Sequence, residues 1–124
     1  MGLCQYGTYL LNFVRLLDKV YSALLNTTDG NINKFTKGAS DTFAITGLET
    51  ALSGPTKIYT NASDDNIYVL DNGNSRIVVF DKTGKYKNQY QAGIIKTAKD
   101  FDVLEKDKKI YVLSDGKIYE VDLK

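Results

Sequence analysis

The residue types that most often perform catalysis are sparse in this sequence. It contains no histidine and a single cysteine, Cys4. Histidine is the commonest general base near neutral pH and, with cysteine, a leading ligand of transition metals. Without histidine a Ser-His-Asp triad cannot be built, and no Cys-x-x-Cys motif or glycine-rich phosphate loop is present. The sequence therefore predicts no catalytic residues, no metal site and no cofactor, and a chain that is not an enzyme.

Carboxylates are plentiful and partly paired. The closest pairs are Asp64 with Asp65 and Asp100 with Asp102. Paired carboxylates can perform acid–base chemistry or bind calcium. These pairs fall where turns are expected and lack the spacing of an EF-hand loop, so a role in turns is favoured.

The charge of the chain is almost balanced. Lysine and arginine number 16 against 15 acidic residues, and only Arg15 and Arg76 are arginines. Nucleic-acid-binding domains usually present a clearly basic face. The composition therefore disfavours a nucleic-acid partner and favours a protein or peptide.

No segment of the sequence resembles a membrane span or a signal peptide. The most apolar stretch, residues 9–25, is interrupted by Asn12, Arg15, Asp18 and Lys19. A spanning helix needs about 20 mostly apolar residues, and a signal peptide needs an uninterrupted apolar middle. The compartment in which the protein acts stays open.

An internal repeat is the main feature of the sequence. Three segments align around Val20, Ile67 and Ile110, at offsets of 47 and 43 residues. Periods of this length are typical of the blades of a β-propeller. After each segment an Asp-Gly or Asn-Gly pair, suited to a tight hairpin turn, leads into a second run of strand-forming residues.

Further short strands are expected around these hairpins. Upstream lie Thr56–Thr60, introduced by Pro55, and Phe101–Leu104; downstream lie Phe43–Ile45 and Tyr86–Gln91. This makes about four strands per unit, as in a propeller blade. The last unit stops after Leu123, so its outer strand is expected to be missing or very short.

The stretch from Pro55 to Tyr90 resembles an NHL repeat. The resemblance rests on Pro55, the strand Ile67–Asp71, Asn74 with Arg76-Ile77, Phe80-Asp81 and Thr83-Gly84-Lys85. The stretch Lys99–Asp122 is a weaker copy. The resemblance implies a propeller fold and the binding of proteins, peptides or RNA on one face of the disc.

The sequence thus predicts an all-β fold, a partial β-propeller of two antiparallel blades plus a partial third. A partial blade is expected at residues 29–46, followed by blades at 47–92 and 93–124. Residues 1–28 form an N-terminal amphipathic segment. Its apolar residues between Leu10 and Leu24 follow helical spacing. A helix is therefore favoured over divergent blade strands for residues 9–25.

Candidate site residues lie mainly on the turns. Asp71 and Arg76 flank the central hairpin, and the NHL resemblance implies that they form a structural pair. Loops on a rigid scaffold commonly carry recognition residues, and the candidates for partner binding are Asn72, Asn74, Ser114, Asp115, Tyr86 and Tyr90. The two turns at residues 72–74 and 114–116 should emerge on one face of the disc, together with the connections near Leu52-Ser53 and Gly93-Ile94.

Propellers usually close a ring of four to eight blades, and this sequence has fewer. The chain is therefore expected to be a fragment of a larger propeller, to self-associate into a ring, or to cap its own exposed blade. The favoured function is a non-enzymatic module that recognises a protein or peptide through one loop face. An RNA-binding NHL-like domain and a fragment of a propeller hydrolase or lyase are the alternatives.

Overall fold

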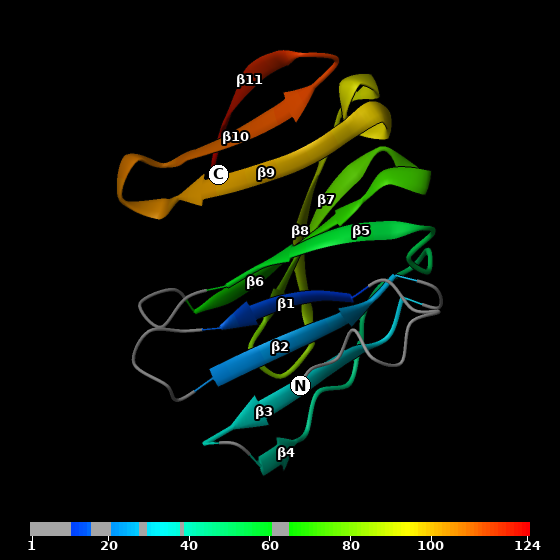
Figure 1. The fold of residues 1–124 in the computed structure, drawn as a ribbon, viewed down its shortest axis with the longest axis vertical. Coiled ribbons are helices and arrows are strands. Elements are labelled where there is room, and N and C mark those ends of the chain that lie inside the picture. Colours follow the sequence, from blue (N-terminus) through cyan, green and yellow to red (C-terminus); the bar gives the residue numbers. More distant parts are fainter. Residues whose placement is uncertain (1–10, 16–20, 28–29, 38, 61–64) are drawn as a thin grey trace.

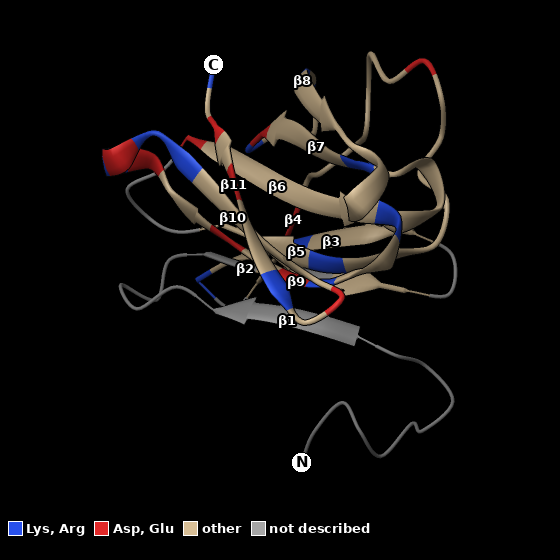
Figure 2. Cartoon of the chain, turned by 90° about the horizontal axis from the view of Figure 1, so that it is seen from above, with Lys and Arg blue, Asp and Glu red and all other residues tan. Residues whose placement is uncertain are grey.

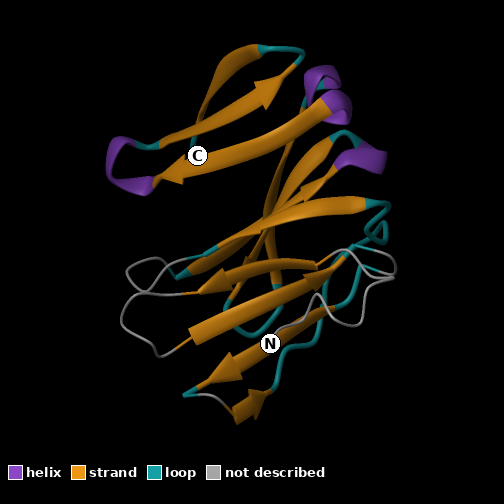
Figure 3. Ribbon diagram, in the orientation of Figure 1, coloured by secondary structure: helices purple, strands orange, loops and turns teal. Residues whose placement is uncertain are grey.

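The structure, a computed structural model, describes residues 11–15, 21–27, 30–37, 39–60 and 65–124. This part of the chain forms eleven strands in three antiparallel sheets that are stacked one on another (Figure 1). Short 3-10 helices occur only in the connections (Figure 3). The prediction of an all-β, propeller-like fold is confirmed.

Each sheet is built from consecutive strands, in the order of the sequence. The first sheet consists of β1 (Leu11–Arg15), β2 (Tyr21–Asn26), β3 (Ile32–Thr36) and β4 (Ala39–Asp41). The second consists of β5 (Pro55–Tyr59), β6 (Asn66–Asp71), β7 (Arg76–Asp81) and β8 (Tyr86–Gln91). The third consists of β9 (Ala98–Leu104), β10 (Lys109–Ser114) and β11 (Lys117–Asp122). We call these sheets the first, middle and third blades.

The two aligned repeats occupy equivalent places in successive blades. Ile67 lies on β6 and Ile110 on β10, the second strand of its blade in each case. Tyr86–Gln91 forms β8, and within the described residues the third blade has no fourth strand. The 43-residue offset in the sequence therefore reflects a real structural repeat, as predicted.

The N-terminal segment differs from its prediction. The expected helix over residues 9–25 is wrong for the described part, because Leu11–Arg15 and Tyr21–Asn26 are strands that pair with each other. β2 also pairs with β3. Strands from the expected N-terminal segment, residues 1–28, and from the expected partial blade, residues 29–46, therefore belong to one sheet. Helical spacing was misleading because pairing with neighbouring strands outweighs local propensity.

A second difference lies after the first hairpin. Phe43–Ile45, expected to be a strand, is irregular, and the outer strand is instead Ala39–Asp41. Thr46, the residue after Ile45, forms an isolated parallel bridge to Lys85, which lies just before β8 of the middle blade. Phe43 packs edge-on against Phe80 at a centroid distance of 6.4 Å. Phe43 therefore serves packing between blades, whereas Ile45 is exposed.

The middle blade is apolar on both faces because a sheet covers each of them. Residues Ile77–Phe80 are all buried, and a continuous apolar run is what a strand enclosed on two sides requires. One face forms a core with the first blade, and its buried members are Ala23, Leu25, Ile32, Ile58, Ile67, Val69, Val78 and Phe80. The other forms a core with the third blade, centred on Tyr68, Leu70, Ile77, Val79, Phe101, Val103, Ile110 and Val112.

The inner edges of the blades come together. β5 contacts β1 and β2 on one side and β9 on the other, and Tyr59 packs edge-on against Tyr68 and beside Phe101. First strands that meet while later strands fan outward are the arrangement of propeller blades around an axis. No helix among the described residues is long and apolar enough to cross a membrane.

Candidate interaction face

Four connections gather at one end of the blades. They are residues 48–54 before β5, the 3-10 helix η2 (Asn72–Asn74) with Ser75, the 3-10 helix η3 (Gly93–Thr97), and the turn at residues 115–116. Hydrogen bonds join each to the next, as the following paragraphs show. We call this surface the turn face, and the prediction that these turns share one face is confirmed (Figure 3).

A buried ion pair lies beneath the turn face. Arg76 Nε donates to Asp71 Oδ2 at 2.7 Å, and their side chains are 5% and 0% exposed. The two terminal nitrogens of the same guanidinium group also donate, Nη1 to Gln89 Oε1 at 2.9 Å and Nη2 to the Thr50 carbonyl at 2.6 Å. Asp71 Oδ1 accepts from the Ser53 backbone N–H at 2.7 Å. The pair therefore ties the central hairpin to the 48–54 connection, which is the structural role that the NHL resemblance implied.

Asn72 links the middle blade to the third. Its Nδ2 donates to the carbonyls of Ile95, at 3.0 Å, and Ala98, at 2.9 Å, while its Oδ1 accepts from Thr56 Oγ1. Asn74 donates to the Ala51 carbonyl at 3.0 Å and to Asp71 Oδ2 at 2.9 Å. Both amides thus hold the frame of the turn face, and their predicted role in partner binding stays a prediction.

Gly73 allows two connections to touch. Its backbone N–H donates to the Ser53 carbonyl at 2.8 Å. A Cβ atom placed on Gly73 would lie 2.3 Å from that carbonyl oxygen. Any side chain here would force η2 away from the 48–54 connection, so only glycine fits the observed contact.

Ser114 and Asp115 belong to the third blade's part of the face. Ser114 is buried, and its Oγ donates to the Ile94 carbonyl at 2.7 Å. Thr97 Oγ1 lies 2.7 Å from Ser114 Oγ and donates to Asp115 Oδ2 at 3.2 Å. Asp115 is exposed. Of these two predicted residues, Asp115 is therefore the one that a partner could reach.

The predicted tyrosines lie on β8 and pack between the blades. Tyr90 is 8% exposed and sits in the core between the middle and third blades, where its hydroxyl accepts from the Lys124 backbone N–H at 3.0 Å. Tyr86 is half-buried and packs against the core with the first blade. Both tyrosines thus have packing roles, and Tyr86 also lines a cleft of about 230 Å³ with Glu49 and Thr50 of the turn face.

Apart from Asp115, the exposed side chains of the turn face were not singled out from the sequence. They come from the connections and from the strand ends beside them, and they are Glu49, Thr50, Ser53, Lys96, Thr97, Lys99, Asp115 and Lys117. No motif marks them, because their common position depends on how three blades stack. Acidic and basic residues are interspersed over the described chain (Figure 2).

The opposite end of the blades carries the β7–β8 turn. Asp81 Oδ1 accepts from the Thr83 hydroxyl and from the backbone N–H groups of Thr83, Gly84 and Lys85. These donors, the Thr83 hydroxyl first, lower the pKa of Asp81 to about 2. The carboxylate is thus a turn-forming group.

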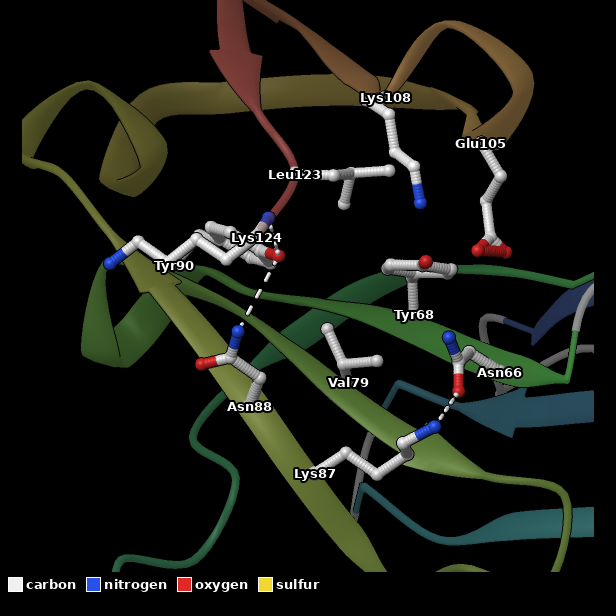
Figure 4. Close-up of a pocket in the computed structure, with 10 residues that line it drawn as sticks. All are labelled: Asn66, Tyr68, Val79, Lys87, Asn88, Tyr90, Glu105, Lys108, Leu123 and Lys124. Atoms are coloured by element: carbon white, nitrogen blue, oxygen red, sulfur yellow. Dashed lines mark hydrogen bonds between the residues drawn. The ribbon is translucent and has the colours of Figure 1, made fainter.

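A cleft of about 250 Å³ also opens at this opposite end, between the middle and third blades. Glu105 and Lys108 reach over the ring of Tyr68 from the third-blade side (Figure 4). Lys87 enters from β8 and is already bonded to Asn66 Oδ1 at 2.8 Å. Cations and an anion share the rim, so the cleft has no single charge preference. Within the described ranges, no cluster of three potential metal ligands occurs.

Comparisons with known proteins agree with this architecture. The NHL repeat matches residues 52–80, which span β5, β6, η2 and most of β7. No curated protein matches the chain.

Solved propeller structures match nearly the whole chain. Kluyveromyces lactis Hsv2 with complete loop 6CD superposes with a TM-score of 0.63 at 8% identity, covering 94% of this chain and 34% of that structure. KlHsv2 with loop 6CD replaced by a Gly-Ser linker gives the same TM-score and identity, with 36% of that structure covered. The chain thus spans about a third of these structures, and the likeness shows the fold. The chain therefore has a partial β-propeller fold, and its residues 52–80 match the NHL repeat.

Proposed function

We propose that this chain is a non-enzymatic binding module that recognises a protein or peptide through its turn face. The observation that carries the proposal is the double hydrogen bond from Asn72 to the Ile95 and Ala98 carbonyls. It fixes the hairpin of one blade to the connection of the next. Together with the bonds from Asn74 to the Ala51 carbonyl and from Ser114 to the Ile94 carbonyl, it holds the four connections of the turn face as one platform.

A rigid platform favours binding because less conformational entropy is lost when a partner docks. Its exposed groups are of mixed type, with Glu49 and Asp115 beside Lys96, Lys99 and Lys117. Mixed charge and hydroxyl groups suit a polypeptide. A strongly basic surface, which would suit RNA, is not supported by a net charge of +1.

The proposal is tested with a displayed library of random peptides selected on the immobilised protein. The selected peptides are then measured against a turn-face variant, Lys96→Glu with Lys99→Glu, and a matched variant of the opposite end, Lys85→Glu with Lys106→Glu. All four lysines are exposed. We expect the first variant to weaken binding and the second to leave it unchanged.

Two results would contradict the proposal. One is that the opposite-end variant alone loses peptide binding while both variants keep the wild-type circular dichroism spectrum. The other is that a labelled single-stranded RNA binds more tightly than any selected peptide, with strong salt dependence. The second result would favour the RNA-binding alternative.

A further inference from the structure

The cleft beside Tyr86 lies between β8 and the connection that leads from the first blade into the middle blade. It measures about 230 Å³ and is lined by residues 47–50, Arg76, Tyr86 and Gln89. Arg76 begins β7, and the other two side chains belong to β8. Both walls of the cleft therefore come from the interior of the sequence, from the middle blade and the connection before it.

Hydrogen bonds fix the two walls to each other. The Tyr86 backbone N–H donates to the Thr46 carbonyl at 2.9 Å, and Arg76 Nη2 donates to the Thr50 carbonyl at 2.6 Å. Residues 47–49 thus run between two points that are both bonded to the middle blade. A cleft with fixed walls can accept a side chain without the entropic cost of ordering a loop.

The charges around this cleft leave one carboxylate uncompensated. Arg76 is paired with the buried carboxylate of Asp71, so these two charges cancel. Glu49 is exposed and forms no ion pair with any residue of the described ranges. The cleft therefore has a net negative charge, which attracts a cation.

Size and wall chemistry decide which cation fits. Sites for small-molecule ligands usually enclose about 300–1,000 Å³, and a cleft of about 230 Å³ is smaller, as suits a single side chain. Tyr86 and Glu49 provide an aromatic side chain and a carboxylate. A guanidinium group uses both, because it stacks on aromatic rings and pairs with a carboxylate through two hydrogen bonds. An ammonium group gains the charge but not the second, parallel hydrogen bond.

We propose that this cleft binds an arginine side chain of the partner polypeptide, with the guanidinium group between Glu49 and Tyr86. The inference rests on the proposed function, because Glu49 and Thr50 belong to the turn face. It adds to that function a residue that the partner carries at this point of the surface.

The direct probe is a single blocked residue, N-acetylarginine methylamide, titrated into isotope-labelled protein and followed by NMR. We expect saturable shifts at the backbone amides of residues 47–50 and Tyr86 and at the side-chain amide of Gln89. The matched probes are the lysine and citrulline analogues, of which citrulline keeps the shape of arginine without its charge. The lysine analogue should bind more weakly than arginine, and the citrulline analogue should not bind.

Variants of the two walls test the role of each group. An exposed ion pair changes affinity by up to about fivefold, so Glu49→Gln should weaken the arginine probe by about this factor. Tyr86→Leu keeps an apolar side chain and should narrow the difference between the arginine and lysine probes. Glu120→Gln is the control, since it makes the same change at an exposed glutamate of β11. It should leave the affinity unchanged.

The inference is overturned if the arginine probe gives no saturable shifts, if the citrulline analogue binds equally well, or if Glu120→Gln weakens binding as much as Glu49→Gln. Shifts confined to the strands of the third blade would assign the probe to that surface and overturn it as well.

The peptides selected from the random library separate this inference from the proposed function. If they bind the turn face but lose no affinity when citrulline replaces their arginines, the proposed function stands and the inference fails. If the arginine probe binds in the cleft while no library peptide binds the turn face, the result supports the arginine site and contradicts the proposed function.

Discussion

Arg76 and Asp71 face each other across the first residue pair of the β6–β7 hairpin, and Arg76 Nε donates to Asp71 Oδ2 at 2.7 Å. The corresponding positions of the third blade hold Ser114 and Lys117, which are likewise directly paired. There the serine hydroxyl bonds the Ile94 carbonyl. One repeat position thus supports the turn face with an ion pair in one blade and with a hydroxyl in the next.

This relationship predicts a large cost for removing one partner of the ion pair. Arg76→Ala should lower the free energy of unfolding by about 3–5 kcal/mol, because it leaves the Asp71 carboxylate buried without its cation. The double variant Asp71→Asn with Arg76→Ala removes both charges and should lose less than Arg76→Ala alone. Urea denaturation measures both. A double variant at least as unstable as Arg76→Ala would show that the cost does not arise from an unpaired carboxylate.

The contact between Gly73 and Ser53 predicts a specific steric effect. Gly73→Ala should lower the free energy of unfolding by about 1–3 kcal/mol, because its Cβ cannot fit beside the Ser53 carbonyl without a backbone shift. Gly93→Ala is the matched control, since nothing lies within 4 Å of a Cβ there. Thermal denaturation of the two variants checks this, and equal stability would contradict the close approach.

The hydrogen bonds of the Asn72 side chain predict that η3 opens more easily when this side chain is removed. Asn72→Ala removes the donor shared by the Ile95 and Ala98 carbonyls and should lower the free energy of unfolding by about 1–3 kcal/mol. The Ile95 backbone N–H, which closes η3 by bonding the Ala92 carbonyl, should then exchange faster. Asn33→Ala, at an exposed position of β3, is the control. Unchanged exchange at Ile95 would mean that Asn72 does not hold η3.

The strands of the middle and third blades could be predicted because their turns carry Asn-Gly and Asp-Gly signals and their apolar runs recur at a fixed offset. The strands of the first blade were harder to predict from the sequence. Its strands β1 and β2 occur where apolar residues also follow a helical period, and only their pairing with β3 decides between the two structures.

The sequence predicted where the turns lie but not which contacts hold them together. The sequence places Asn72 and Ser114 at turns, but it does not reveal that their side chains bond to η3. Those bonds depend on the stacking of blades distant in the sequence. Lys96 and Lys99 went unnoticed for the same reason, since nothing local marks them as neighbours of η2.

The Asp81 turn predicts a pH-dependent contribution to stability. The pKa of Asp81 is lowered from 3.8 to about 2 in the folded chain, chiefly by the Thr83 hydroxyl. The carboxylate therefore stabilises the fold above about pH 4, and this contribution is lost as the pH falls toward about 2. Asp81→Asn should remove this dependence in denaturation series across the range. Thr83→Val should raise the Asp81 pKa in a carboxyl NMR titration, and an unchanged value would contradict the assigned cause.

Hydrogen exchange of the protein with and without a peptide selected from the random library tests the central claim most directly. If the turn face is the binding surface, protection should increase at the backbone amides of residues 49–54, 72–75 and 93–97. Amides of the β7–β8 turn at residues 82–85 should be unchanged. Protection confined to residues 82–85 and 105–108, with none at the turn face, would contradict the account.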